Sequence, residues 1–281
     1  MISEHRGPLV AGWLLSAPAV VVVAAFGILP TLNILLEAFR TDGTPSLANF
    51  QGLLDSGLAV QSFWRTLRVA VATTVLTVFA GYPLALMILK ARPRTSTIIL
   101  MIVVFPLMVS VVVRTYGWLV ILGPSGIINQ ALLALGLVQA PLQLVRNEVG
   151  IIIAETQLLL PYMVLSLIAV LQKVDPHLEE AALSLGANPV VNLVRVILPI
   201  SLPGLLSGVL LVFSLALTAF ATPLLIGGPR VPLLTTLLYS YVFSSYDWGA
   251  AAAVAVVLIV LALVFITAQR LMAGAGLKRH G

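Results

Sequence analysis

Residues 175–203 read DPHLEEAALSLGANPVVNLVRVILPISLP, and this polar interruption between two long hydrophobic runs decides the fold. Asp175 and Pro176 are typical of a helix N-cap followed by proline at the first helical position. Apolar residues at positions 178, 181, 182 and 185 share one face of the helix that follows. Gly186 predicts the end of this helix, because glycine adopts the left-handed C-terminal conformation at little cost.

A second helix is predicted directly after this corner. Asn188 and Pro189 repeat the cap-plus-proline signal, and Leu198 with Pro199 predicts the end of the helix. The expected unit is a helix, a glycine corner and a helix, held at the membrane surface with a face of small residues. Such a unit is suited to dock into a groove on another protein. An amphipathic interfacial hairpin without a partner is the alternative.

Composition places the chain in a membrane. Of its 281 residues 60% are hydrophobic and 9% are charged, and the mean hydropathy is +1.12. Soluble domains carry about 25% charged residues. The fold class expected is therefore an all-α polytopic membrane protein. There is no cysteine, which excludes disulfides and thiolate metal sites.

Six transmembrane helices are expected. About 20 apolar residues cross the ~30 Å hydrocarbon layer. We interpret residues 9–29 as a retained first span, because the run is longer than the apolar part of a signal peptide and no convincing cleavage site follows. Short helices are predicted at 127–137 and 233–242, with a loop at 41–61. Residues 1–61 then hold the first span and its outer loop, residues 62–281 form the core domain, and residues 172–202 form the loop described above. The six predicted spans are 9–29, 69–89, 98–122, 149–171, 203–226 and 249–268.

The distribution of lysine and arginine predicts the orientation. Fourteen of these residues fall outside the spans, nine on the side of residues 172–202 and five on the other side, which also has the longer loops. The side with the excess is cytoplasmic by the positive-inside rule. Both termini and the loop at 172–202 are therefore expected in the cytoplasm. The net charge of +5 then reflects topology rather than nucleic-acid binding.

Catalytic patterns are absent from the sequence. The three lysines, Lys90, Lys173 and Lys278, do not follow the glycine spacing of a phosphate-binding loop. The three histidines lie outside the spans, so an intramembrane hydrolase would lack its base. No group of residues has metal-ligand spacing. If transport is driven by ATP, the ATPase is a separate chain.

Two ionisable residues are expected within the spans. Arg114 lies near the outer interface, where an arginine commonly extends its guanidinium to the headgroups. Glu155 is an intramembrane carboxylate, which is a functional-site candidate by default. It could pair with Arg114, line the path of a solute, or contact water. We add Tyr162, in the same span as Glu155, as a third candidate for the solute path.

Four prolines fall in or beside the last spans and the loop. They could act as hinges of a gate or be static kinks, which are equally common in membrane helices. They are Pro161, Pro199, Pro203 and Pro223.

The loop resembles the EAA loop of ABC importer permeases. The family pattern is EAA, three residues, G, nine residues, I, one residue, LP. Here it reads Glu180-Ala181-Ala182, Gly186, Val196 and Leu198-Pro199, so only Val196 departs from it, by one methylene. The resemblance implies that these residues couple the permease to an ATPase. Glu180 would pair with a basic residue of that ATPase, whereas Glu179 is expected to be a solvated charge.

The resemblance extends along the chain and narrows the family. VVVRTYGWLVILGPSGIINQALLALGL (111–137), LLLPYMVLSLIAVLQKVDPHLEEAALSLGA (158–187) and FATPLLIGGPR (220–230) look like the spermidine/putrescine-type permeases. This implies a type I ABC importer fold in a bacterial inner membrane. The implied partners are two copies of a cytoplasmic ATPase that binds ATP and Mg²⁺, a second and different permease, and an outer solute-binding protein. The implied solute is a polyamine or a similar small organic compound, and this chain would hold no cofactor of its own.

A self-contained carrier or channel for a small cation is the alternative function. It would need a charged pathway inside the membrane, and the spans offer only Arg114 and Glu155. Copurification with an ATPase, lost when Glu180 or Gly186 is changed, separates the two functions.

Overall fold

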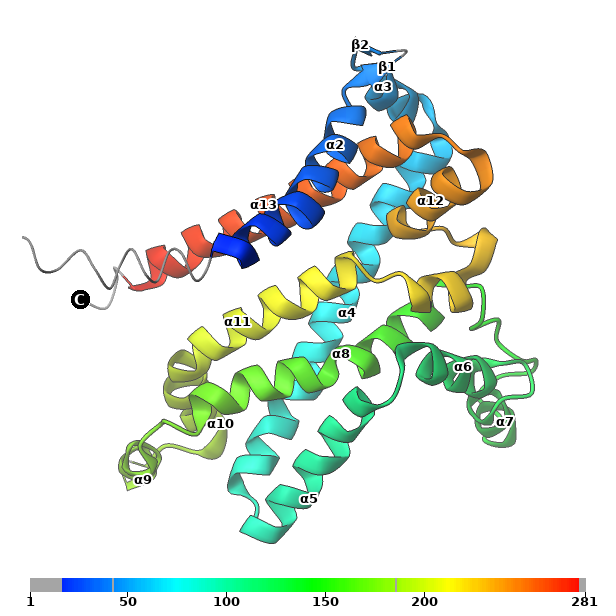
Figure 1. Ribbon diagram of the computed structural model, residues 1–281. Coiled ribbons are helices and arrows are strands. Elements are labelled where there is room, and N and C mark those ends of the chain that lie inside the picture. The colour runs from blue at the N-terminus through cyan, green and yellow to red at the C-terminus, as the bar shows by residue number, and fades with distance from the viewer. Residues whose placement is uncertain (1–16, 42, 185, 278–281) are drawn as a thin grey trace, which may run out of the picture. The chain divides into compact units, whose positions relative to one another are not determined.

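The computed structural model describes residues 17–41, 43–184 and 186–277, most of which are helical (Figure 1). Two compact units divide the chain. Unit 1 comprises Met1–Gly57 and Leu238–Val257, and unit 2 comprises Leu58–Leu237 and Leu258–Gly281. Within the described residues, six helical stretches are long and apolar enough to cross a membrane, which confirms the number predicted. They are Ala17–Glu37, Gly57–Lys90, Val111–Ala134, Glu148–Leu171, Pro189–Leu217 and Trp248–Leu271.

Unit 1 is built on the first of these helices. Its buried centre is made of alanines, Ala38, Ala252 and Ala253, with larger side chains packed around them. The side-chain amide of Asn49 donates to three backbone carbonyls, including that of Arg40 at 2.9 Å. The elements of the unit are η1 (Ala24–Ile28), α2 (Leu29–Glu37), β1 (Arg40–Thr41), β2 (Thr44–Pro45), α3 (Ala48–Asp55), η6 (Tyr241–Ser245) and the first part of α13 (Trp248–Leu277). The two strands are antiparallel, with Arg40 opposite Pro45.

The first span and its loop differ from the prediction. The span was expected to end at residue 29, but the helix continues to Glu37. The start expected at Leu9 lies outside the described residues. Residues 41–61 were expected to be a loop, yet they contain a strand pair and two helical segments. Pro30 is tolerated because a wider π turn, η1, precedes it and Leu29 donates to the carbonyl of Ala24.

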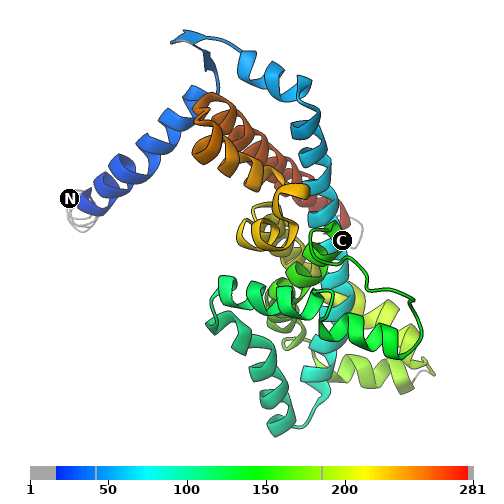
Figure 2. The ribbon, with the colours of Figure 1, turned by 90° about the vertical axis from the view of Figure 1, so that its right-hand side faces the viewer.

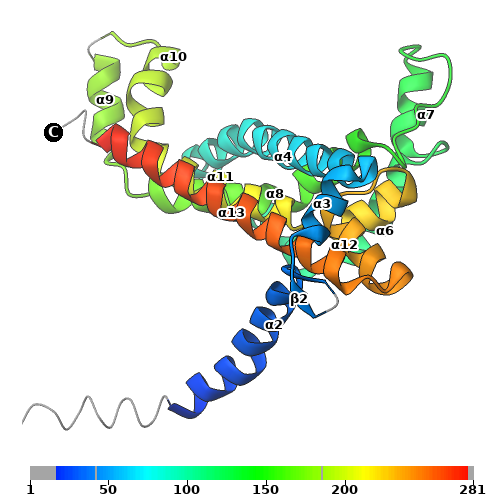
Figure 3. The same cartoon turned by 90° about the horizontal axis from the view of Figure 1, so that it is seen from above.

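Unit 2 contains the remaining helices. Its elements are α4 (Gly57–Lys90, whose first residue belongs to unit 1), α5 (Pro93–Val104), η2 (Phe105–Met108), α6 (Val111–Leu122), α7 (Ile127–Ala134), α8 (Glu148–Leu171), α9 (Pro176–Ser184), α10 (Pro189–Asn192), η3 (Leu193–Ile197), α11 (Leu198–Leu217), η4 (Pro223–Gly227), η5 (Gly228–Arg230), most of α12 (Leu234–Ser240) and the second part of α13. Seen from above, α9 and α10 lie together at one end of this unit and α7 lies at the other (Figure 3).

The helix pair α8 and α11 packs side by side and forms the centre of unit 2 (Figure 1). The contact is close because Gly204 and Gly208, four residues apart on α11, face α8. A Cβ added at Gly204 would lie 2.9 Å from the carbonyl oxygen of Ser166 and 2.9 Å from Cβ of Val170. Small residues at this spacing let two helix backbones approach each other in a membrane.

The fourth span and the two short helices agree closely with the structure, and the sixth span agrees at its start. The fourth span was expected at 149–171 and is α8, Glu148–Leu171. The helices expected at 127–137 and 233–242 are α7 and α12. The sixth span begins within one residue of the prediction and continues beyond residue 268 to Leu277.

The second span was predicted too short. Its helix α4 begins at Gly57 rather than at residue 69. Arg65 and Arg68 end the hydrophobic run, but the helix continues past them because tertiary contacts hold it. Thr66 Oγ1 accepts a hydrogen bond from the backbone N–H of Leu234 at 2.8 Å.

The third span was predicted as one helix, and the structure divides it. α5 and η2 end at Met108, the backbone is extended at Val109 and Ser110 (ψ 138° and 137°), and α6 then begins at Val111. The chain changes direction at this break (Figures 1 and 2). Pro106 explains part of the interruption, because proline cannot donate the backbone hydrogen bond that continues a helix.

The fifth span was predicted in the wrong place. It was expected at 203–226, with the preceding helix ending at Leu198 and Pro199. Instead, α10, η3 and α11 form one continuous helix from Pro189 to Leu217, and residues 223–227 form the separate turn η4. Pro199 does not break the helix because Leu198 donates to the carbonyl of Leu193, five residues back. The same Ile-Leu-Pro sequence follows a π turn in the first span.

Candidate functional site

Residues 172–202, the predicted coupling loop, begin with a helix that forms as the sequence indicates. α9 begins at Pro176, and Asp175 Oδ1 accepts a hydrogen bond from the backbone N–H of His177 at 3.0 Å. Ala181 is exposed and Ala182 is half-buried. The side chains of Glu179, Glu180 and the residue at 185 lie outside the described part of the chain. The pairing predicted for Glu180 therefore stays a prediction.

The corner after α9 depends on a glycine conformation. Gly186 has φ +84°, in the left-handed region that favours glycine. The backbone N–H of Ala187 donates to the carbonyl of Ala182 at 3.1 Å, which closes the end of the helix. Asn188 then caps the next helix, since its Oδ1 accepts from the N–H of Val191 at 2.8 Å. Both cap predictions are confirmed.

The second helix of the loop is the beginning of the fifth span. Val196 and Leu198 are half-buried, and Pro199 is exposed. η3 joins α10 to α11 without a break, so one continuous helix runs from the loop to the contact between α11 and α8. The sequence prediction of a helix that ends at Pro199 concealed this connection.

Two cavities lie between the coupling loop and the last turn of α4. One, of about 380 Å³, is lined by Leu178, Val196 and Lys90 among others. The other, of about 430 Å³, includes Asn192 in its lining. Asn192 is 2% exposed, and no residue in the described part of the chain bonds its Oδ1. The loop is therefore not packed tightly against α4 at this end.

Glu155 lies inside unit 2, at 4% exposure on α8. The hydroxyl of Thr222 lies near its carboxyl group, and Arg114 is close enough for electrostatic attraction. Thr222 Oγ1 lies in turn 3.3 Å from Thr115 Oγ1. These groups bring α6, α8 and the segment before η4 together around one buried carboxyl group.

The direct Glu155–Arg114 ion pair, one of the alternatives from the sequence, is not formed. Glu148, at the other end of α8, is the carboxylate that pairs with Arg65 and Arg68. Arg114 Nε and Nη1 are buried without a hydrogen-bond partner among the described residues. Arg114 and Gln157 line a cavity of about 340 Å³ beside the break of the third span. Non-helical backbone at this depth is found where it lines a cavity.

Tyr162 is half-buried and lies seven residues after Glu155, on the same face of α8. The structure therefore places all three solute-path candidates in unit 2, with Arg114 and Glu155 close together. Trp118, which was not a candidate, donates from Nε1 to Gln157 Oε1 at 3.1 Å. It adds a polar bridge between α6 and α8 near Arg114.

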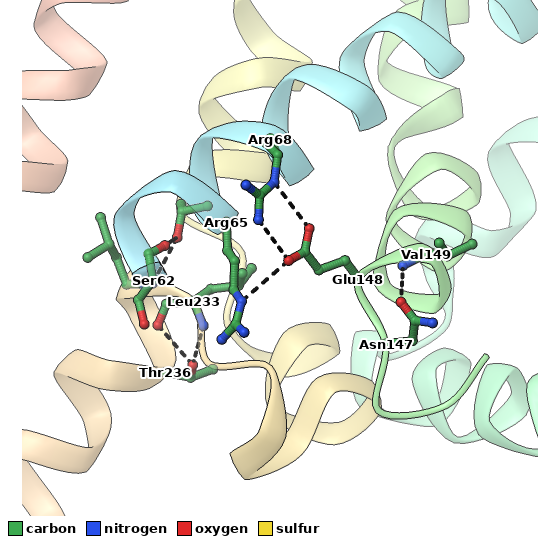
Figure 4. Close-up of polar contacts among 10 residues, drawn as sticks. Ser62, Arg65, Arg68, Asn147, Glu148, Val149, Leu233 and Thr236 are labelled. Atoms are coloured by element: carbon green, nitrogen blue, oxygen red, sulfur yellow. Dashed lines mark hydrogen bonds and ion pairs between the residues drawn. The ribbon is translucent and has the colours of Figure 1, made fainter. Parts of the chain in front are cut away.

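An ion-pair cluster at the other end of α8 was missed by the sequence reasoning. Glu148 receives Arg68 Nη2 at 3.0 Å and Arg65 Nε at 3.3 Å (Figure 4). Asn147 caps α8 by accepting from the N–H of Val149 at 3.2 Å. The cluster joins α4 to α8, and no pattern within one helix would have indicated a partner 80 residues away.

Residues 74–274 match the model of the binding-protein-dependent transport system inner membrane component family. The chain belongs to this family. The matched region begins within α4 and includes the coupling loop and all three solute-path candidates. The chain is accordingly a multi-pass membrane protein of the ABC permease class, as the resemblance predicted.

Relatives within the permease family support the same conclusion. The spermidine/putrescine transport system permease protein PotB of Haemophilus influenzae is 34% identical over 250 residues, which cover 86% of this chain and 87% of that protein. PotB of Escherichia coli is 29% identical over 94% of this chain and 96% of its own length. This permease is therefore similar to both relatives over most of its length.

Solved structures show the fold. A chain of a bacterial alginate ABC transporter, in complex with an alginate pentasaccharide-bound periplasmic protein, superimposes with a TM-score of 0.81. The match covers 96% of this permease and 97% of that chain at 20% identity. At this identity the likeness concerns the fold alone, and it confirms the ABC importer permease fold.

Proposed function

We propose that this permease is the non-catalytic membrane subunit of an ATP-driven importer of polyamines or similar small organic solutes. The assignment of the solute rests on the similarity to PotB proteins over most of the chain. A buried carboxyl group, Glu155, supports it, because a polycation crossing a membrane needs a negative partner. Tyr162 on the same helix face supplies an aromatic surface that can also contact a cation.

The proposed assembly contains four kinds of subunit. Two copies of a cytoplasmic ATPase bind ATP and Mg²⁺, a second and different permease completes the pore, and an outer binding protein delivers the solute. The coupling loop and both termini face the cytoplasm in this proposal. The excess of lysine and arginine on the side of the loop supports that orientation.

The coupling loop is proposed to transmit the ATPase motion. Exposed α9, with its small side chains, meets the ATPase, and Gly186 sets the angle to α10. Motion of the loop then passes along the continuous helix from α10 to α11. Closely packed elements respond to such a displacement as rigid bodies, which turns a small shift at the loop into a movement of α11 against α8, the helix that carries Glu155.

The proposal is tested by ATP hydrolysis of the reconstituted complex with its ATPase, second permease and binding protein. We expect spermidine or putrescine to stimulate hydrolysis, and we expect Glu180→Lys to remove the stimulation. An ATPase that does not copurify with the permease would contradict the importer function and favour the self-contained carrier. Stimulation by another solute alone would contradict only the polyamine assignment.

Glu155→Gln is expected to weaken polyamine transport. The change keeps the shape of the side chain beside Thr222 but removes the negative charge. We expect the polyamine concentration for half-maximal transport to rise about tenfold, equivalent to about 1.4 kcal/mol. Uptake by membrane vesicles measures it. Gln157→Glu, at a half-buried position two residues further along α8, is the comparison, because it adds a carboxylate on a different face of the same helix. An unchanged concentration dependence would remove Glu155 from the solute path.

A further inference from the structure

Two arginines share a cavity at the end of unit 2 opposite to the coupling loop. Arg146 and Arg230 both line this cavity, which has a volume of about 270 Å³ and whose other lining residues are apolar except for Gln143. Both side chains belong to exposed residues. In the part of the chain that the structure describes, neither guanidinium makes a hydrogen bond or an ion pair. The cavity therefore presents two unpaired positive charges.

The backbone around the two arginines is held in place. Arg146 has φ +61°, an uncommon conformation for a residue other than glycine. Its backbone N–H donates to the carbonyl of Ile226 at 2.7 Å, which ties its loop to the segment that carries Arg230. Asn129, fully buried, donates to the carbonyl of Leu142 at 3.1 Å and accepts from the N–H of the same residue at 2.7 Å. A surface fixed in this way loses little entropy on binding.

The charge of this end of unit 2 is unbalanced. The charged residues of unit 2 that fall outside the predicted spans on this side are Arg65, Arg68, Arg146, Arg230 and one carboxylate, Glu148. That carboxylate is already occupied by Arg65 and Arg68 (Figure 4). Carboxylates on another protein are attracted to such a surface.

We propose that Arg146 and Arg230 form a docking point for an acidic segment of the solute-binding protein. This rests on the proposed function, which places this end of unit 2 on the outer side. The guanidinium groups receive carboxylates of that segment, and the apolar walls of the cavity receive an adjoining side chain. Exposed pairs of this kind act mainly by steering the encounter, so they affect the association rate and its dependence on salt.

The test measures binding of the solute-binding protein to the full complex in nanodiscs at low and high salt. The variant is Arg146→Asn with Arg230→Gln, because asparagine tolerates the left-handed backbone at position 146. The control is Arg92→Gln with Arg94→Gln, which removes two exposed arginines from the predicted cytoplasmic side. We expect the first variant to bind about tenfold more weakly, with a flatter salt dependence, and the control to bind as the unchanged complex does.

Three results would overturn the proposal. The first is equal affinity of the variant and the unchanged complex. The second is a difference that vanishes when anionic lipids are omitted, since the arginines would then bind lipid headgroups. The third is a variant whose ATP hydrolysis stays low at saturating binding protein, which would indicate a structural role. Failure of the unchanged complex to bind the protein at all would contradict the proposed function itself, whereas the first three results leave that function intact.

Discussion

Gly186→Val is expected to abolish solute-stimulated ATP hydrolysis, while Gly186→Asn is expected to retain most of it. Position 186 has φ +84°, which a β-branched residue adopts only with strain, whereas asparagine adopts such angles more readily than other residues. An added Cβ would meet no steric obstacle in the described part of the chain, because it has no neighbour there within 4 Å. The difference between the two variants therefore isolates the backbone conformation.

The strain at position 186 is relieved by changing the corner between α9 and α10. A corner closed at another angle presents α9 wrongly to the ATPase and weakens the mechanical connection to α11. We expect stimulation to fall at least about tenfold in the valine variant and to stay within about threefold in the asparagine variant, because one left-handed residue costs roughly 1–2 kcal/mol. ATPase assays on the purified complex measure this. Equal activity of the two variants would show that the corner conformation does not control coupling.

Gly204→Leu is expected to prevent the permease from accumulating in the membrane. The added side chain would enter the contact between α11 and α8, where a Cβ would already lie 2.9 Å from the carbonyl oxygen of Ser166. A backbone oxygen cannot move aside as a flexible side chain does, so the two helices must separate. Forcing extra atoms into a packed contact costs about 3 kcal/mol. Quantified membrane fractions and the melting temperature of the purified complex report the loss.

Gly117→Leu is the matched control for this change. Gly117 lies on α6, and a Cβ there has no neighbour within 4 Å. The same substitution should leave the accumulation of the permease in the membrane unchanged. Assembly of this variant with the second permease is measured separately. If both leucine variants accumulate equally, the close approach of α8 and α11 does not limit stability.

Local sequence signals predicted the coupling loop because its structure depends on local chemistry. Asp175, Gly186 and Asn188 act through hydrogen bonds and dihedral angles within a few residues, and the structure confirms all three. Hydrophobic run length likewise predicted the number of spans and the bounds of α8. The family pattern added a role for the loop that no local signal contains.

The helix ends predicted at proline and arginine residues were wrong because they depend on interactions beyond the local sequence. Pro199 normally ends a helix, yet a π turn lets the helix pass through it. Arg65 and Arg68 end a hydrophobic run, yet α4 includes both of them, and both pair with Glu148 on another helix. In both places the outcome depends on how neighbouring turns or distant residues satisfy the backbone and the charge.

The sequence by itself determined that this protein is a six-span ABC permease with a capped, glycine-cornered coupling loop, because run length, caps and motif spacing act over short distances. Only the tertiary structure decided how the spans are connected and which groups meet. It joined the coupling loop to the fifth span, broke the third span, and placed Glu155 beside Thr222 and Arg146 beside Arg230. These arrangements arise from contacts between residues far apart in the chain, whose formation depends on packing rather than on local propensity.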